Sequence, residues 1–319
     1  MTTPIVLNAA DVAALLPQLD VLAELRSLFQ ALGEGQAAQP AQTVTDFPGG
    51  GGDFITYLGA IAAQGVFGAK LSPYIPVKNG APIITAWTQL MSMTTGAPLA
   101  MVDAMQLTTE RTAGTTALAV DLLAPATASR LAIVGAGPVA QAHLHHVLGL
   151  RDWDEIRVFS PSLGADADKQ ALWSGLSSAV TLAGDADSCI AEADVVMLCT
   201  SSGHPVINPL MLKRGALVTS ISTNAPNAHE VPPEFLTAAE VYCDYAPTTP
   251  AAAAEMRLAV QNHGWSADDL RGDLAELTCG TCPMPTGVRP VYFRSVGLGL
   301  EDIAMAHGVW KLAQAAGEK

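Results

Sequence analysis

Apolar positions in the first part of the chain change from a helical to an alternating pattern. An apolar stripe with Asp20 as its N-cap predicts a helix over residues 21–32. Thr108 or Thr109 can cap a second, longer helix that ends near Leu123. Between the two helices, stretches rich in β-branched and aromatic residues predict strands over residues 54–60, 65–72, 83–93 and 98–102.

The pattern changes again near Arg130, where apolar runs begin to alternate with helical stretches. The runs have the length of strands, namely LAIV at 131–134, EIRVFS at 155–160, DVVMLCT at 194–200 and ALVTSIS at 216–222. Near-continuous apolar runs suit parallel strands that are covered on both faces, so the alternation predicts a Rossmann-type doubly wound parallel sheet. We expect the last helical stretch, EDIAMAHGVWKLAQAA, to pack on the N-terminal part of the chain.

Composition limits the kinds of partner. The 319 residues are half hydrophobic and only 14% charged, which is enough for two domains with buried cores. Acids outnumber bases 30 to 16, and the net charge of −14 disfavours nucleic acid and anionic membranes. The chain has neither an apolar run of membrane-spanning length nor the basic start of a signal peptide. Five cysteines make a poor disulfide framework, so we expect reduced thiols in a cytoplasmic protein.

The clearest chemical motif is a glycine-rich turn between a predicted strand and a predicted helix. Gly135, Gly137 and Ala140 form a GxGxxA pattern, in which the glycines allow a tight turn and the close approach of a pyrophosphate. Pro138 fits the first helical turn because no intrahelical partner is lost there. The pattern predicts a dinucleotide site, and the alternative is a plain strand-to-helix turn.

The end of the next strand bears on the choice between NAD and NADP. A ribose-binding acid or a base for the 2′-phosphate is expected there, but the chain has Ser160. Asp166 and Asp168 come before Lys169, the first base, and would repel a phosphate. We therefore expect NAD, with NADP not excluded.

Two cations are candidates for the chemistry. Strand alternation places Lys70 on the face opposite Phe67 and Leu71, where it can face a cleft; the alternative is a lysine that protects a sheet edge. We expect Arg111 in the first turn of the second helix, where a cation opposes the helix dipole and can instead clamp a carboxylate or phosphate. Its alternative is an ion pair with Glu110 or Glu301.

Other reactive side chains give weaker signals. The CGTC segment at 279–282 is a lone CxxC, so neither structural zinc nor a redox role is expected, and no metal site is predicted. His143, His145 and His146 are expected on the surface or in the packing of the predicted Rossmann helix. His229, beside Glu230, is either a site residue or half of a solvated loop pair.

Several segments resemble the ornithine cyclodeaminase/mu-crystallin family between about residue 20 and residue 315. They are GVFGAKLS, GAPLAMVDAMQLTTERTAG, IVGAGPVAQAH, ADVVMLCTSSGHPVI, NAHEV and FRSVGLGLEDIAMA. The resemblance implies a Rossmann domain, placed at 124–291, inserted into an α+β substrate-binding and dimerisation domain, placed at 1–123 plus 292–319. It also implies a homodimer with an active site between the domains.

The resemblance carries roles onto particular residues. Lys70 matches a lysine that contacts substrate and can transfer a proton, and Arg111 matches an arginine that contacts the substrate carboxylate and the cofactor. Gln42, Asn224 and Val296 match substrate positions. The matches to cofactor positions are Thr85, Pro138, Val139, Ser160, Thr200, Ile221, Ser222, Thr223, Asn224 and Ser295, which join Gly135 and Gly137 of the glycine turn.

Two departures from the family pattern bear on the reaction. The cyclodeaminases have an acid/base aspartate where this chain has Asn224, and a second arginine where it has Gln42. Both changes favour plain imine reduction: an enzyme that uses NADH to convert a small 2-imino acid to an L-amino acid. Polar residues at the expected pocket make iminosuccinate, which gives L-aspartate, the first hypothesis. The alternatives are a cyclodeaminase that recycles its NAD, a cyclic ketimine reductase, an enzyme like alanine dehydrogenase, and a binding protein like mu-crystallin.

Overall fold

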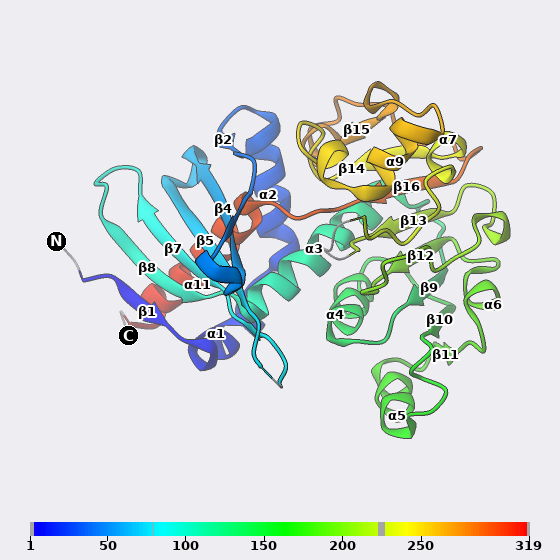
Figure 1. Cartoon of the computed structure of the whole chain (residues 1–319), viewed down its shortest axis with the longest axis horizontal. Coiled ribbons are helices and arrows are strands. Elements are labelled where there is room, and N and C mark those ends of the chain that lie inside the picture. Colours follow the sequence, from blue (N-terminus) through cyan, green and yellow to red (C-terminus); the bar gives the residue numbers. More distant parts are fainter. Residues whose placement is uncertain (1–2, 79, 223–226, 318–319) are drawn as a thin grey trace. The chain divides into compact units, whose positions relative to one another are not determined.

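The computed structural model describes residues 3–78, 80–222 and 227–317, and the chain divides into two compact units (Figure 1). Unit 1 consists of Met1–Arg111 and Gly297–Lys319, and unit 2 is Thr112–Val296. These boundaries differ from those expected after residues 123 and 291. The first lies inside helix α3 (Met105–Leu123), and the second follows strand β16 (Val291–Arg294), which pairs within the sheet of unit 2.

Unit 1 is built on a mixed sheet in the order β1-β8-β7-β5-β4-β2, with β3 paired to β4 and β6 to β5. Only the β1–β8 pair of this sheet is parallel, within the described residues. Its elements are β1 (Ile5–Leu7), α1 (Ala9–Leu15), α2 (Val21–Gly33), β2 (Ala37–Ala38), β3 (Thr43–Asp46), β4 (Asp53–Ile61), β5 (Val66–Ile75), β6 (Ile83–Ile84), β7 (Trp87–Ser92), β8 (Pro98–Asp103) and α11 (Gly299–Gly317).

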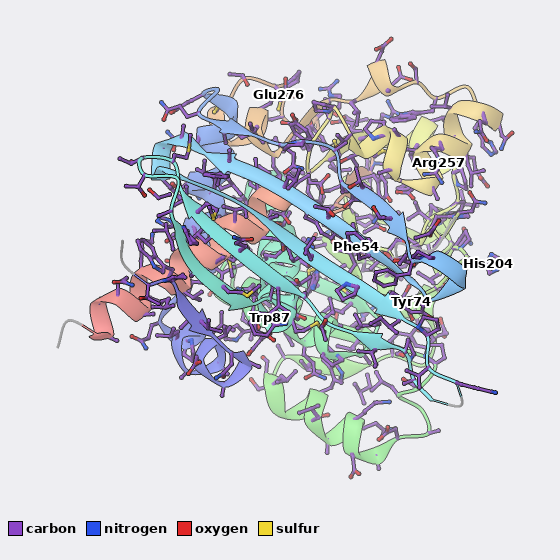
Figure 2. All side chains as sticks on the ribbon, turned by 60° about the vertical axis from the view of Figure 1, so that its left-hand side comes forward. Phe54, Tyr74, Trp87, His204, Arg257 and Glu276 are labelled. Carbon is purple, nitrogen blue, oxygen red and sulfur yellow. The ribbon has the colours of Figure 1, made fainter. Side chains whose placement is uncertain are left out.

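Helix α11 covers one face of this sheet, where it packs on β4, β5 and β7, and it also contacts α1 and α2 (Figure 1). Gly59 of β4 permits this approach, because a Cβ there would lie 3.0 Å from the backbone of Leu300. The C-terminal helix therefore packs on the N-terminal part, as expected. The opposite face of the sheet lies in front of α11 in Figure 2. The strand register places the exposed apolar side chains of Leu58, Phe67 and Leu71 on this face.

Unit 2 is a doubly wound sheet in the order β11-β10-β9-β12-β13-β16-β14-β15, in which every described pair is parallel. Its elements are β9 (Arg130–Val134), α4 (Pro138–Val147), β10 (Glu155–Phe159), α5 (Ala167–Leu176), β11 (Val180–Leu182), α6 (Ala186–Ile190), β12 (Val195–Leu198), β13 (Leu217–Ser220), α7 (Phe235–Ala238), β14 (Glu240–Cys243), α8 (Thr249–Ala252), α9 (Ala254–Asn262), β15 (Gly272–Asp273), α10 (Leu274–Cys279) and β16. The strand order reverses between β9 and β12, and a crevice forms at such a point beyond the carboxyl ends of the strands.

Two details of the expected elements are wrong. Helix α3 begins at Met105 rather than after Thr108 or Thr109, because the Asp103 carboxylate accepts a hydrogen bond from the Met105 N–H. The Thr108 hydroxyl donates to the Ala104 carbonyl within the helix instead of capping it. The stretch expected as one strand over 83–93 forms two, β6 and β7, which are separated at residues 85–86. Among the described residues, no helix is long and apolar enough to cross a membrane.

Candidate active site

Lys70 lies at the centre of the unit 1 sheet and points toward α11. Its strand β5 has β4 on one side and β7 on the other, so the edge-lysine alternative is wrong. The side chain is only 1% exposed, and its Nζ donates to Asp302 Oδ1 at 2.9 Å and to Thr108 Oγ1 at 3.2 Å. The ammonium also lies 4.2 Å from the centre of the Tyr57 ring. A lysine in the middle of a sheet is thus held by a carboxylate, a hydroxyl and an aromatic face.

Arg111 reaches the same carboxylate from α3. Its Nη1 donates to Glu301 Oε2 at 3.0 Å and its Nε to Asp302 Oδ1 at 3.3 Å. The ion pair with Glu301, one of the two alternatives from the sequence, is therefore present. The expected place of Arg111 in the first helical turn is wrong because α3 begins six residues earlier. Gly297 lies against the guanidinium, since a Cβ there would be 2.2 Å from Nη1.

Together Lys70, Arg111, Glu301 and Asp302 form a buried charge cluster with two cations and two carboxylates. Burial lowers the pKa of Lys70 most strongly, and the Arg111 charge lowers it further, while Asp302 opposes both. A lysine with a lowered pKa gives up its proton more readily near neutral pH. The cluster can thus hold a carboxylate through its cations and transfer a proton through Lys70.

The sequence pattern did not single out Asp302. Both acids lie in the first turn of α11, where the helix dipole favours carboxylates, and the sequence analysis named only Glu301, as an alternative partner of Arg111. The available signal in the sequence was the apolar stretch on either side of the two acids. In the structure Glu301 and Asp302 are 0% and 2% exposed. A buried carboxylate requires a partner, and here the partners are the two candidate cations.

In unit 2, the glycine turn links β9 to α4 and has the geometry that a pyrophosphate requires. Gly135 has φ 123°, and a Cβ there would lie 2.3 Å from the Cys199 carbonyl oxygen, so no other residue fits. Gly137 is the N-cap of α4, makes no side-chain cap, and has open space where a Cβ would lie. Pro138 occupies the first helical turn, and Val139 follows it. The N–H groups of this turn and the open Gly137 fit a dinucleotide.

The end of β10 places the second expected cofactor contact. Ser160 Oγ lies 3.1 Å from Ser162 Oγ, which gives this position two adjacent hydroxyl groups. Lys169 is paired with Asp166 at 3.1 Å, and both side chains are well exposed. Hydrogen bonds from Lys169 lower the pKa of Asp166. The base that could meet a 2′-phosphate is therefore already engaged with an acid.

The buried carboxylate of Glu230 joins the residues that follow β12 to those that follow β13. Glu230 is 0% exposed and accepts hydrogen bonds from the Thr200 N–H at 2.7 Å and the Thr200 hydroxyl at 2.8 Å. It also accepts from the Ser220 hydroxyl at 2.7 Å and the Ser222 N–H at 2.8 Å. We call these four residues the Glu230 clamp. Thr200 and Ser222 were expected cofactor contacts, and Ile221 lies between two clamp residues.

The importance of Glu230 was missed, because the sequence drew attention to its neighbour His229. The His229 ring nitrogen Nδ1 lies 2.7 Å from the Asn227 carbonyl oxygen, so this ring makes a local loop contact and not an ion pair with Glu230. Thr223 and Asn224, two further expected contacts, lie outside the described residues.

A second buried carboxylate fixes the segment after β16. Asp244 Oδ2 accepts hydrogen bonds from the Ser295 hydroxyl at 3.1 Å and from the Val296 N–H at 2.6 Å. Beside it, Arg294 pairs with Glu255 at 2.9 Å. Ser295 and Val296, expected to contact cofactor and substrate, are thus held at the end of the unit 2 sheet.

All the expected contacts with substrate and cofactor stay predictions, and two of them lie in unit 1 outside the charge cluster. Gln42 is half-buried in the segment before β3, and its buried Oε1 has no hydrogen-bond partner among the described residues. Thr85 lies between β6 and β7 and accepts a hydrogen bond from the Ser72 hydroxyl through its carbonyl at 3.3 Å. An unpaired buried acceptor costs free energy unless a donor reaches it, so Gln42 is suited to a ligand that donates.

The histidines of α4 divide between core and surface. His143 is fully buried between the Val139 carbonyl, 2.7 Å from Nδ1, and the Thr116 hydroxyl, 3.0 Å from Nε2. Burial lowers its pKa to about 4, and the charge of His146 adds to this effect. In the described ranges, no group of three or more His, Cys, Asp or Glu side chains is arranged to hold a metal ion.

Comparisons with known proteins agree with this arrangement. A family model described as the ornithine cyclodeaminase/mu-crystallin family matches residues 2–317. The NAD(P)H-dependent anabolic L-arginine dehydrogenase DauB of Pseudomonas aeruginosa is 55% identical over 315 residues, 98% of either chain.

Two solved structures have the same fold. The Δ1-pyrroline-2-carboxylate reductase of Thermococcus litoralis, in complex with NADH and L-proline, superposes with a TM-score of 0.88 at 20% identity and covers 98% of both chains. The iminosuccinate reductase of Paracoccus denitrificans, in complex with NAD+, superposes with a TM-score of 0.88 at 21% identity. The match covers 98% of this chain and 97% of the reductase chain. At these identities the likeness concerns the fold alone.

Proposed function

Because the chain belongs to the ornithine cyclodeaminase/mu-crystallin family, we propose that it is an NAD(P)H-dependent oxidoreductase that interconverts a 2-imino acid and an L-amino acid. We further propose that the amino acid is L-arginine and that the oxo acid is 5-guanidino-2-oxopentanoate, combined with ammonia. The observation that carries the substrate is the 55% identity, over nearly the full length of both chains, to an anabolic L-arginine dehydrogenase.

The charge cluster supports a substrate with a cationic side chain over iminosuccinate, the first hypothesis from the sequence. Both cations already face carboxylates, Lys70 with Asp302 and Arg111 with Glu301, so the cluster carries no net positive charge for a second substrate carboxylate. The net charge of −14 also attracts a guanidinium and repels a dicarboxylate. The buried Oε1 of Gln42 has no hydrogen-bond partner among the described residues, so it suits a substrate side chain that donates hydrogen bonds, such as a guanidinium.

Lys70 and Arg111 have different parts in the proposed reaction. Arg111 holds the α-carboxylate through its planar fork, which takes the place of part of its contact with Glu301. Lys70, whose pKa burial lowers, donates the proton that the nitrogen needs when the imine carbon accepts a hydride. Asp302 lies within 3.3 Å of both cations and keeps them side by side. Thr108 and Tyr57 fix the ammonium from the other directions.

The cofactor half of the reaction belongs to unit 2. When bound there, NADH or NADPH supplies the hydride. The N–H groups at the start of α4, beyond Gly135 and Gly137, would hold the pyrophosphate, and Ser160 the adenosine ribose. NAD remains the expected cofactor, but two serine hydroxyls at the end of β10 neither attract nor repel a 2′-phosphate strongly. Apparent KM values for NADH and NADPH test this, and a strong preference for NADPH would refute it.

The exposed face of the unit 1 sheet supports the expected homodimer. Leu58 on β4, Phe67 and Leu71 on β5 and Met101 on β8 share this face and are 37–48% exposed. Several exposed apolar side chains on one face of a sheet are typical of a protein interface. A monomer mass in light scattering at micromolar concentration would refute the dimer. The expected cytoplasmic location stays a prediction.

A panel of substrates tests the proposed reaction. NADH oxidation is followed with 5-guanidino-2-oxopentanoate, oxaloacetate or pyruvate, each with ammonia, and with Δ1-pyrroline-2-carboxylate. The proposal expects the highest kcat/KM with the guanidino acid. A higher kcat/KM with oxaloacetate and ammonia would favour iminosuccinate as the substrate. A higher kcat/KM with Δ1-pyrroline-2-carboxylate would indicate a cyclic ketimine reductase. Ammonia release from ornithine without net NADH formation would indicate a cyclodeaminase, and nucleotide binding without turnover a binding protein.

A further inference from the structure

The buried carboxylate of Glu230 accepts hydrogen bonds from Thr200 and Ser222, two of the proposed cofactor contacts. We propose that Glu230 is a positioning residue, whose buried carboxylate sets Thr200 and Ser222, which follow β12 and β13, for the nicotinamide cofactor. This inference rests on the proposed function, because it takes the carboxyl edge of the unit 2 sheet as the cofactor site.

The first argument is the pairing at each carboxylate oxygen. Oε1 accepts from the N–H and the hydroxyl of Thr200, and Oε2 accepts from the Ser220 hydroxyl and the Ser222 N–H. An ionised carboxylate has about four acceptor positions, and here four donors fill them. Thr200 Oγ1 also accepts from the Ser202 N–H at 3.2 Å, so its own proton points to Glu230.

The second argument is the backbone at Ser222. Its φ of 46° lies in the left-handed region, which a residue other than glycine adopts at a cost. The Glu230 carboxylate offsets this cost by binding the Ser222 N–H. The Ser222 hydroxyl is buried and has no hydrogen-bond partner among the described residues, so it is kept available for a ligand. Strain held by a buried carboxylate next to an unpaired hydroxyl is typical of a prepared binding site.

The third argument is that the strand end is also tied from another direction. Arg294 of β16 donates to the Ser220 carbonyl at 3.3 Å, while Glu230 holds the Ser220 hydroxyl. The end of β13 is therefore fixed through both its backbone and its side chain. The hydrogen bond from the Ser222 N–H to Glu230 then holds the next turn of the chain against a strand end that is already fixed.

The geometry gives a sharp test with Glu230→Gln. Because each oxygen of Glu230 faces one backbone N–H, the amide NH2 of glutamine must meet a backbone N–H in either orientation. A hydroxyl can rotate away from such a clash, but a backbone N–H cannot. We expect the Kd for NADH, measured by fluorescence titration without any oxo acid, to rise about tenfold or more. Ser220→Ala removes one donor of the clamp and raises this Kd about threefold.

Glu234→Gln is the matched control, since Glu234 is an exposed carboxylate a few residues further along the chain. It should bind NADH with the Kd of the wild type. Titrations are made well below the melting temperature of each variant, so that only folded protein is compared. If Glu230→Gln lowers the melting temperature but keeps the wild-type Kd, Glu230 is merely structural and the inference fails.

The remaining outcomes are equally decisive. If Glu230→Gln does not fold, Ser220→Ala decides: weaker NADH binding supports the clamp, and an unchanged Kd overturns it. NADH binding does not depend on the oxo acid. A failure with 5-guanidino-2-oxopentanoate would therefore refute the proposed substrate and leave the result on Glu230 standing.

Discussion

Both units bury carboxylates at their candidate sites, but they use them differently. In unit 1, Asp302 and Glu301 face cations, Lys70 and Arg111. In unit 2, Glu230 faces four neutral donors, two of which are backbone N–H groups. Buried ion pairs cost much desolvation energy and gain little net stability. Hydrogen bonds from backbone N–H groups to a carboxylate, by contrast, fix the chain itself.

The difference separates two tasks. Cations paired with carboxylates can exchange a protein carboxylate for a substrate carboxylate, and burial lowers the pKa of Lys70, so the charge cluster suits binding and proton transfer. A carboxylate whose acceptor positions are filled by donors of the chain itself has none left for a ligand and suits shaping a site. Changes in the charge cluster should therefore affect turnover, whereas changes around the glycine turn and α4 should affect cofactor binding or stability.

The largest expected effect belongs to Lys70→Met, which keeps most of the side-chain volume and removes the proton donor. We expect kcat with the guanidino acid to fall by about 10²–10⁴ while NADH fluorescence binding stays within about twofold. Lys311→Met is the control, because Lys311 is an exposed lysine of α11 paired with Glu24. Turnover that survives in Lys70→Met would show that the assignment of Lys70 is wrong.

Arg111→Lys preserves the charge and removes the fork that a carboxylate needs. We expect kcat/KM for the oxo acid to fall by about a hundredfold, mainly through KM. Arg257→Lys, at an arginine that donates to the Ala252 carbonyl in unit 2, should keep the wild-type kinetics. An unchanged KM in Arg111→Lys would mean that another group holds the carboxylate.

Substitution by alanine should lower the stability at one glycine of the turn and weaken NADH binding at the other. Gly135→Ala places a Cβ against the Cys199 carbonyl at a positive φ, so we expect a loss of about 2–3 kcal/mol in the free energy of unfolding. Gly137→Ala meets open space, so its stability should be unchanged and only its NADH Kd should rise. Urea unfolding and NADH titration of both variants check this, and equal stabilities would contradict it.

His143 tests the packing of unit 2 through pH. Its folded pKa of about 4 lies below the ordinary value of 6.5, so the folded state binds fewer protons than the unfolded state between these values. Its contribution is complete above pH 6.5 and is lost as the pH falls toward 4. Between pH 7.5 and 5 the wild type should lose about 2 kcal/mol more than His143→Gln in urea unfolding. Parallel losses in the two proteins would mean that His143 does not titrate as described.

Much of the fold could be predicted because local patterns determine it. The glycine turn, the apolar runs of β9, β10, β12 and β13, and the helix capped by Asp20 appear as expected. Strands such as β15 were missed because two residues show no periodicity. The start of α3 was predicted wrongly because Asp103 as well as two threonines can accept a hydrogen bond from the first N–H groups of a helix, and in the structure Asp103 accepts it.

Apart from the Arg111–Glu301 pair, the partners in the sites could not be predicted from the sequence, for a different reason. Lys70 and Asp302 are separated by 232 positions and meet only when α11 packs on the sheet. Glu230 joins segments that lie 30 and 8 residues before it. The sequence shows which side chains are charged, but only the packing of the folded chain determines which carboxylate binds which donor.

The most direct test of the proposed reaction follows a label from the cofactor to the product. The protein is given NADH deuterated at the transferable position of the nicotinamide, 5-guanidino-2-oxopentanoate and ammonia, and the product is examined by chiral chromatography and mass spectrometry. We predict L-arginine that is one mass unit heavier, with deuterium on the α-carbon. Unlabelled arginine, or no arginine at all while oxaloacetate under the same conditions yields labelled aspartate, would contradict the account.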